Sequence, residues 1–225
     1  FSNFGEFFMM PKPTLDKMYI DVGATSAEDC PVKVGYVACF DRPFEDLGNR
    51  LVSKAMDDRI ATAIMAQALK DMKSTVNEVY FVFSTQEEVG LRGATTSAYS
   101  IDPEVGFAID VTPTLDTPKG AFNDVKLGKG PAIKAKDSSL VVDPRVVAWM
   151  EKACVSLNIP HQFEVISAGG TDGGAINLTR SGVPAGCISV PTRYVHTPSE
   201  MVDYEDVVNC VKLTVELVSK PIDLG

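Results

Sequence analysis

Continuous apolar runs alternate with amphipathic helical patterns from about residue 50 to the end of the chain. Three runs are predicted to be strands buried on both faces, at 79–83, 105–109 and 186–190. Apolar residues three and four positions apart predict helices over 57–73, 143–158 and 203–219. A further short helix is expected to open at Gly170, Thr171 and Asp172. This alternation predicts an α/β sandwich with a largely parallel sheet.

The first 49 residues have a different pattern. Short alternating runs at 17–22 and 33–40 are separated by Gly, Pro and Asp, which is typical of short antiparallel strands. Such strands are too few to cover a core alone. We therefore expect a small β-rich domain over 1–49 and a larger α/β domain over 50–225.

Composition narrows the function classes. The 225 residues carry a net charge of −9, which argues against binding to nucleic acid or to a membrane surface. Five cysteines without CxxC spacing favour buried, reduced thiols, and no signal-peptide pattern opens the chain, so a cytoplasmic protein is expected. The chain has only two histidines, His161 and His196, so a metal site here must depend on carboxylates.

Polar, metal-binding residue types follow each predicted strand. Glu87 and Glu88 follow the first, Asp110 follows the second, and His196 follows the third. Ligands of open α/β sheets bind beyond the carboxyl ends of the strands, so these side chains are expected to converge. Carboxylate and imidazole donors suit Zn²⁺, Co²⁺ or Mn²⁺. The pattern indicates a hydrolytic metal site.

The individual residues also have plainer interpretations. Glu87 and Glu88 could be solvated loop residues, although adjacent side chains point apart, so that one could bind metal while the other acts as general base. Asp57 and Asp58 could cap a helix or bridge two metal ions. His196 could be an ordinary exposed histidine.

Three further features have two interpretations each. The glycine-rich loop 168–174 lacks the Gly-Lys-Ser/Thr ending of a phosphate-binding loop, and it could be a tight turn or a close approach for substrate. Arg193 could pair with an acidic substrate or with a structural carboxylate. His161 is expected to start a surface strand.

Five segments together resemble the M42 family of metallo-aminopeptidases, some of whose members carry an endoglucanase label. They are Lys54–Arg59, Ser84–Ala94, Ala108–Val111, Gly169–Gly173 and Pro191–His196. The resemblance extends over about residues 17–219. It implies an α/β/α sandwich of the zinc-exopeptidase type, with part of an inserted dimerisation domain that includes Ile20–Ala24.

The resemblance also implies a role for each matching residue. Asp57 would bridge two divalent ions, zinc or cobalt, and would precede a cis peptide to the catalytic Asp58. Glu88 and His196 would bind one ion, Asp110 the other, and Glu87 would be the general base. The residues that would contact substrate are Arg193, Gly170, Thr171 and Asp172. Family members remove N-terminal residues from peptides inside homo-oligomers, with dimers assembling into dodecamers.

One departure from the family pattern is clear. The family's His-x-Asp motif, whose histidine binds the same ion as Asp110, does not occur in this sequence. One ligand set is therefore complete and the other lacks a nitrogen, which predicts one bound ion or none and a truncated, processed or partial member. A non-catalytic, oligomerising fragment is the alternative. A glycosidase is disfavoured, because adjacent glutamates are badly placed to flank a glycosidic bond.

Overall fold

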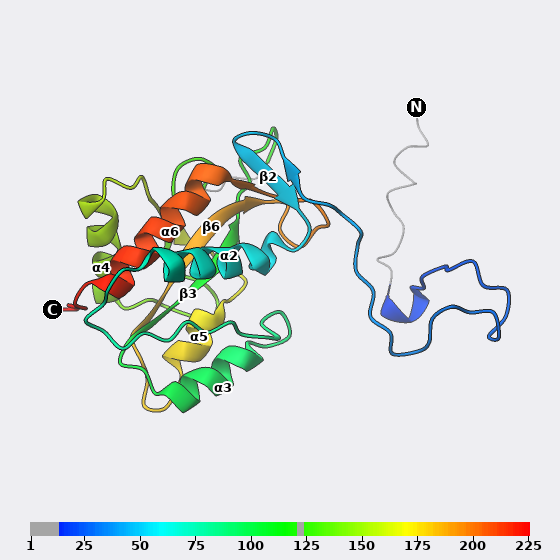
Figure 1. Ribbon diagram of the computed structural model, residues 1–225, viewed down its shortest axis with the longest axis horizontal. Helices are drawn as coiled ribbons and strands as arrows, with labels where there is room; N and C mark the ends of the chain where they lie inside the picture. Colours follow the sequence, from blue (N-terminus) through cyan, green and yellow to red (C-terminus); the bar gives the residue numbers. More distant parts are fainter. Residues whose placement is uncertain (1–13, 121–123) are drawn as a thin grey trace. The chain divides into compact units, whose positions relative to one another are not determined.

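The computed structural model describes residues 14–120 and 124–225 and divides the chain into two compact units, Phe1–Cys39 and Phe40–Gly225 (Figure 1). The described part of the first unit holds one 3-10 helix, η1 (Leu15–Lys17), followed by bends and turns. The strands predicted at 17–22 and 33–40 are wrong, because no described residue from 14 to 44 lies in a strand. Their side chains are mostly exposed, and isolated strands without a core are marginally stable.

The second unit is built on one seven-stranded sheet. Its described strands are β1 (Glu45–Asp46), β2 (Arg50–Ser53), β3 (Gly106–Pro113), β4 (Ala132–Lys136), β5 (Gln162–Val165), β6 (Ala185–Arg193) and β7 (Glu200–Asp203). The order is β1-β2-β7-β6-β4-β5, and β3 pairs with β6. Only the β3–β6 and β4–β5 pairs are parallel, so the prediction of a largely parallel sheet is wrong.

Helices cover both faces of this sheet (Figure 1). They are α2 (Met56–Asp71), α3 (Arg92–Ile101), α4 (Pro144–Ser156), α5 (Asp172–Asn177) and α6 (Tyr204–Ser219). Helices α2, α4 and α6 pack on the face that carries Ile109 and Ile188, whereas α5, with α3 beside it, packs on the face that carries Asp110. The helices predicted over 57–73, 143–158 and 203–219 are confirmed to within two residues at each end, and so is the α/β/α sandwich. The short helix begins as predicted but ends at Asn177, and α3 was not predicted.

Capping residues fix where two of these helices begin. Asp203 accepts hydrogen bonds from the backbone N–H groups of Glu205 and Asp206 at the start of α6. At the start of α4, Asp143 accepts a hydrogen bond from the backbone N–H of Arg145. Pro144 occupies the first turn, where a backbone N–H would have no partner within the helix. These caps place α4 and α6 over the apolar face of the sheet, against a core that includes Ile133, Met150 and Leu213.

The opposite face of the sheet holds a buried ionic group. Lys134 is 1% exposed, and its Nζ lies 2.9 Å from Glu164 Oε1 and 3.5 Å from Asp137 Oδ2. Glu164 also accepts hydrogen bonds from Thr112 on β3 and Ser189 on β6. The group therefore ties four strands together on the same face as Asp110, whose partner across β3 and β6 is Ser189.

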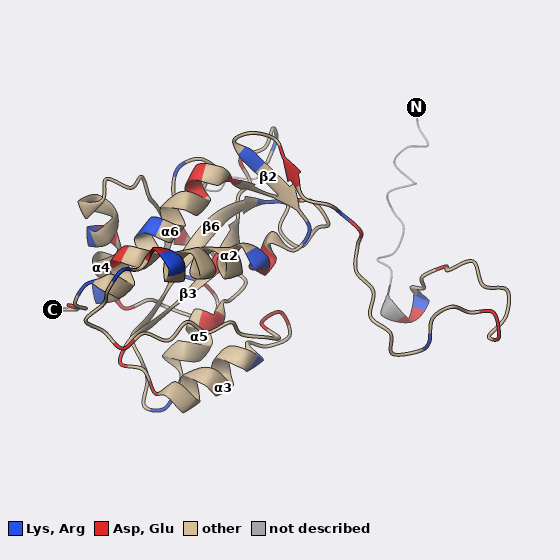
Figure 2. Cartoon of the chain, in the orientation of Figure 1, with Lys and Arg blue, Asp and Glu red and all other residues tan. Residues whose placement is uncertain are grey.

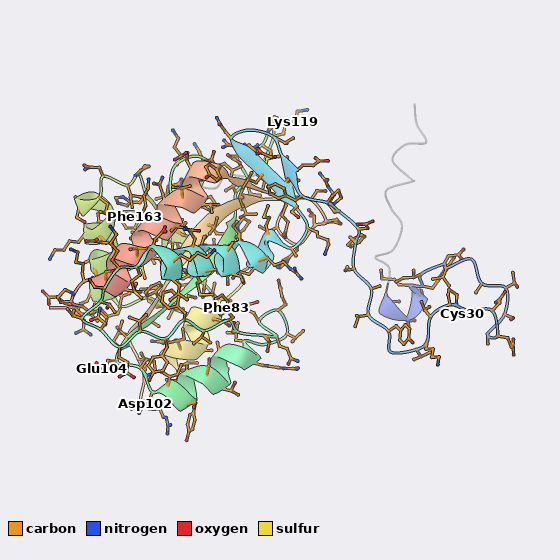
Figure 3. All side chains as sticks on the ribbon, in the orientation of Figure 1. Cys30, Phe83, Asp102, Glu104, Lys119 and Phe163 are labelled. Atoms are coloured by element: carbon orange, nitrogen blue, oxygen red, sulfur yellow. The ribbon has the colours of Figure 1, made fainter. Side chains whose placement is uncertain are left out.

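The predicted strand at 79–83 is absent from the sheet. Residues 78–87 belong to no helix or strand, and Tyr80 and Phe83 are 57% and 50% exposed (Figure 3 labels Phe83). The continuous apolar run predicts a strand buried on both faces, but none of the described strands pairs with this segment. It lines one wall of a cavity of about 440 Å³, with β3 and α3 on other sides.

Lys, Arg, Asp and Glu are interspersed along α2 and α6, so neither helix carries charge of one sign only (Figure 2).

All five cysteines are free, but only three are buried. Cys39 is exposed and Cys30 is half-buried, contrary to the prediction of buried thiols. In the part of the chain that the structure describes, no helix is both long and apolar enough to cross a membrane.

Candidate metal centre

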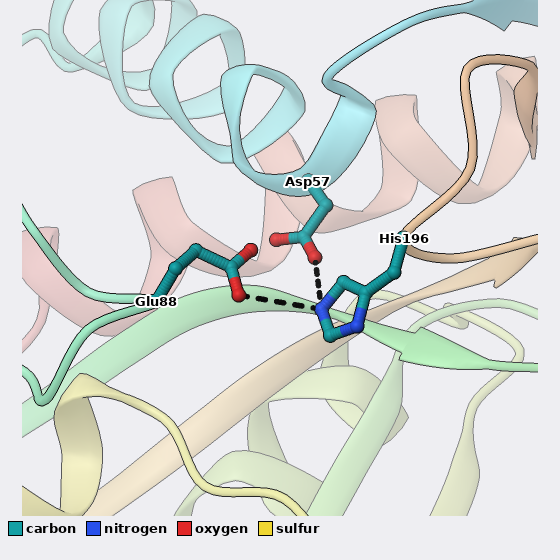
Figure 4. Close-up of side chains that lie close together, drawn as sticks. All are labelled: Asp57, Glu88 and His196. Carbon is teal, nitrogen blue, oxygen red and sulfur yellow. Dashed lines mark ion pairs between the residues drawn. The ribbon is translucent and has the colours of Figure 1, made fainter. Parts of the chain in front are cut away.

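Three side chains from separate parts of the second unit meet at one point (Figure 4). His196 Nε2 lies 3.1 Å from Asp57 Oδ2 and 3.4 Å from Glu88 Oε2. Asp57 is in the first turn of α2, Glu88 is in the loop before α3, and His196 is in the loop between β6 and β7. One donor atom from each lies within 4.8 Å of the others, which is a separation suited to one metal ion.

A second group of close donor atoms also includes Asp57. Donor atoms of Asp57, Asp58 and Asp110 also lie within 4.8 Å of one another. The peptide bond between Asp57 and Asp58 is cis, and both residues have non-helical backbone angles inside α2. Asp58 also accepts a hydrogen bond from Ala61 N at 3.4 Å, as the side chain of a helix-capping residue does. The second group contains carboxylates alone.

Burial and crowding raise the pKa of every carboxyl group in these clusters for which a shift is resolved. Burial, with the charge of Glu88 next, raises the pKa of Asp57 to about 7. Burial and the charge of Asp110 raise the pKa of Asp58 to about 10. Burial and the charge of Glu87 raise the pKa of Asp110 well above its usual value. Carboxylates held this close repel one another, and a bound cation would relieve that repulsion.

Glu87 shares the cavity described above with the carboxylates. The cavity is lined by Asp57, Asp58, Glu87, Glu88, Asp110 and Asp172, and by apolar side chains of 79–83 and α3. Burial and the charges of Glu88 and Asp172 raise the pKa of Glu87 to about 7. A carboxyl group with a pKa near neutrality is suited to accept and return a proton.

The residues predicted to contact substrate lie in different surroundings. Asp172 lines the cavity, where it accepts a hydrogen bond from Ser84, while its Oδ1 and Thr171 Oγ1 are buried without a partner among the described residues. A Cβ on Gly170 would lie 2.8 Å from Ser139 Oγ, so packing already requires glycine there. Arg193 pairs with Asp116 at 2.7 Å. His161 precedes β5, as predicted, and belongs to neither cluster.

Glu200 is the site residue that sequence reasoning missed. It begins β7, is 2% exposed, and accepts hydrogen bonds from the backbone N–H groups of Asp57 (3.0 Å) and His196 (2.8 Å). The signal available in the sequence was a glutamate four residues after His196.

The raised pKa values predict that the metal-free protein loses stability as the pH rises. Unfolded Asp and Glu lose their protons near pH 4, whereas folded Asp57 and Glu87 keep theirs until about pH 7. Between these values the folded state binds more protons, so the free energy of unfolding decreases with increasing pH. Melting temperatures measured in chelator at about pH 5 and pH 7.5 should differ in that direction, by about 2–4 °C per kcal/mol lost. A higher melting temperature at pH 7.5 would contradict the prediction.

The chain matches one family model and several curated proteins. The family model described as M42 glutamyl aminopeptidase matches residues 8–213. A protein of Acetivibrio thermocellus is 49% identical over 206 residues, 91% of this chain and 62% of that protein. Lysyl aminopeptidase of Pyrococcus furiosus is 34% identical over 215 residues, 92% of this chain and 61% of that protein.

Solved structures give the same result. An aminopeptidase from Desulfurococcus kamchatkensis superposes with a TM-score of 0.90 at 41% identity, covering 96% of this chain and 62% of that one. The TET1 peptidase of Pyrococcus horikoshii superposes with a TM-score of 0.72 at 31% identity, covering 81% of this chain and 54% of that one. The chain thus spans about three fifths of the length of the curated relatives it matches. It belongs to the M42 peptidase family.

Proposed function

We propose that the protein is a metal-dependent aminopeptidase that removes N-terminal residues from peptides. The observation that carries the proposal is the cluster of Asp57, Glu88 and His196, which adjoins the cavity that holds Glu87. Membership of the M42 family supports the reaction class, and the name of the lysyl aminopeptidase relative supports the substrate class.

The donor set fits a divalent cation. Two carboxylates and an imidazole with donor atoms within 4.8 Å suit Zn²⁺ or Co²⁺, and the side chain of His196 is 68% exposed, which leaves a path for ion and substrate. A cation held there would polarise the peptide carbonyl and make a water molecule more acidic. Asp57, Asp58 and Asp110 would hold a second ion only weakly, because neither histidine of the chain joins them.

The side chains around the cluster have distinct roles in this proposal. Glu87 accepts a proton from the attacking water and returns it to the departing amine, for which its pKa of about 7 is suited. Asp58, which follows Asp57 across the cis peptide bond, would act with Asp57 and Asp110 in the second group. The apolar walls of the cavity lower the local polarity and would strengthen these electrostatic interactions.

We assign substrate recognition to polar side chains in and near the cavity. Asp172 lines the cavity, so its carboxylate is placed to attract a substrate's terminal ammonium group. Thr171 is 3% exposed and, like Gly170, does not line the cavity, so both would act by supporting Asp172 rather than by touching substrate. Arg193 would reach an acidic substrate side chain only by sharing its guanidinium with Asp116.

We further propose that the protein forms homo-oligomers in the cytoplasm. The Pyrococcus horikoshii TET1 peptidase assembles into a tetrahedron or a large octahedral shell. Large apolar side chains are exposed in the first unit, including Tyr19, Ile20, Val34 and Val37, and an interface between copies would bury them. Five free thiols fit a reducing compartment.

A non-catalytic role is the second candidate, and the all-carboxylate second group favours it. Metal content separates the two possibilities. For the catalytic proposal we expect at least one tightly bound ion per chain, release of nitroaniline from a panel of aminoacyl-nitroanilides, and loss of that activity in chelator with recovery on Zn²⁺ or Co²⁺ addition. Bound metal without turnover on any member of the panel would favour the non-catalytic role. Turnover that survives metal removal would refute the mechanism.

A further inference from the structure

We propose that Glu200 is a positioning residue that sets the separation of Asp57 and His196 and thereby the metal affinity of the site. The inference rests on the proposed metal site and adds a residue that touches neither metal nor substrate. Glu200 Oε2 accepts a hydrogen bond from Asp57 N at 3.0 Å, and Oε1 accepts one from His196 N at 2.8 Å. One buried carboxylate thus binds the backbones of two ligand residues.

The topology explains why such a link is needed. Asp57 and His196 lie far apart in the sequence, on α2 and on the loop between β6 and β7. Strand β7 pairs with β2 in a register that sets Glu200 opposite Ser53, shortly before α2 begins. Glu200 therefore lies where the chain entering α2 meets the chain leaving the histidine loop.

The backbone of His196 depends on this contact. His196 has a φ of +63°, a left-handed conformation that a residue with a Cβ adopts only when its surroundings hold it there. The hydrogen bond from its N–H to Glu200 joins its backbone to the same carboxylate that binds Asp57 N. Loss of Glu200 would remove this support for the position of the imidazole relative to Asp57.

The chemistry of Glu200 cannot be replaced by an amide. Two N–H donors face two carboxylate oxygens, so both oxygens must accept. Glutamine has the same shape but offers one acceptor, and its NH₂ group would face an N–H donor in a buried site. The negative charge of Glu200 also adds to the attraction that Asp57 and Glu88 exert on a cation.

The chain offers a matched control in Asp206. It is 1% exposed, and its two oxygens accept hydrogen bonds from the backbone N–H groups of Gly128 and Gly130, each at 2.7 Å. It belongs to neither metal-ligand group. Asp206→Asn therefore removes the same kind of buried double acceptor without touching the proposed ligands.

The test measures Zn²⁺ and Co²⁺ affinity of the full 225-residue chain by competition with a chromophoric chelator, together with the visible spectrum of the Co²⁺ form. We expect Glu200→Gln to weaken binding about 10–100-fold and to shift the Co²⁺ bands, as loss of a residue that orients ligands does. Asp206→Asn should leave both unchanged although it also lowers stability. If Glu200→Gln does not fold, Glu200→Asp, which withdraws both acceptors by one methylene, should show the same weakening.

The outcomes separate the two proposals. Wild-type affinity and spectrum in a folded Glu200 variant would overturn the positioning role and leave the metal site standing. Equal weakening by Asp206→Asn would overturn it too, because the loss would then follow from general destabilisation. A wild-type chain that binds neither ion would refute the proposed metal site itself.

Discussion

Glu87→Gln is expected to lower the rate of nitroaniline release by about 10²–10⁴-fold while leaving bound metal unchanged. Glutamine has nearly the same size but cannot accept the proton of the attacking water. Because Glu87 lies outside both groups of close donor atoms, its loss should not empty the site. Turnover numbers and metal content of the same preparation provide the measurement.

The neighbouring residue supplies the control. Glu88→Gln changes the same functional group one position away, but Glu88 Oε2 lies 3.4 Å from His196 Nε2 within the cluster. We expect this variant to lose metal and activity together. If Glu87→Gln also lost metal, or kept full turnover, the assignment of Glu87 as general base would fail.

Lys134→Met is expected to reduce the free energy of unfolding by about 3–5 kcal/mol, since it leaves buried carboxylates without their cation. Lys134 is 1% exposed and lies between Glu164 and Asp137, both of which are fully buried at the side chain. Methionine fills similar space but supplies no charge and no donor. Urea unfolding monitored by circular dichroism would measure the loss, and a melting temperature lower by about 10 °C would accompany it.

Lys136→Met is the matched control for this change. It lies two residues further along β4 with an exposed side chain, so the same substitution should alter stability by less than about 0.5 kcal/mol. Adding Glu164→Gln to Lys134→Met should recover part of the loss, because it removes one unpaired charge. A Lys134 variant as stable as the wild type would show that the buried ion pair contributes nothing.

The sequence predicts well those elements whose pattern reflects a local requirement. Helices α2, α4 and α6 follow the spacing of their apolar residues, and β3 and β6 follow their continuous apolar runs. The sequence also predicts the convergence of Asp57 with Glu88 and His196 and with Asp110, although Glu88 follows a segment that forms no strand and Asp110 lies within β3. The roles of these residues remain predictions until they are measured.

The errors arise where long-range pairing decides the structure. The apolar run at 79–83 has the composition of a buried strand, but a strand also needs a neighbour, and composition carries no information on that. The antiparallel placement of β4 beside β6 depends on the path of the connecting chain. Glu200 was missed because its partners are backbone N–H groups, one of them in the distant Asp57, and backbone groups leave no trace in residue types.

The unpaired segment before Glu87 has a consequence for local unfolding. No backbone hydrogen bond of the sheet holds residues 79–83, so we expect this stretch to open locally at a lower free energy than the strands of the sheet. Glu87 is anchored from its other side, where its carbonyl accepts hydrogen bonds from the N–H groups of Gly90 and Leu91 before α3. Local opening of the apolar run therefore need not move the loop that holds Glu87.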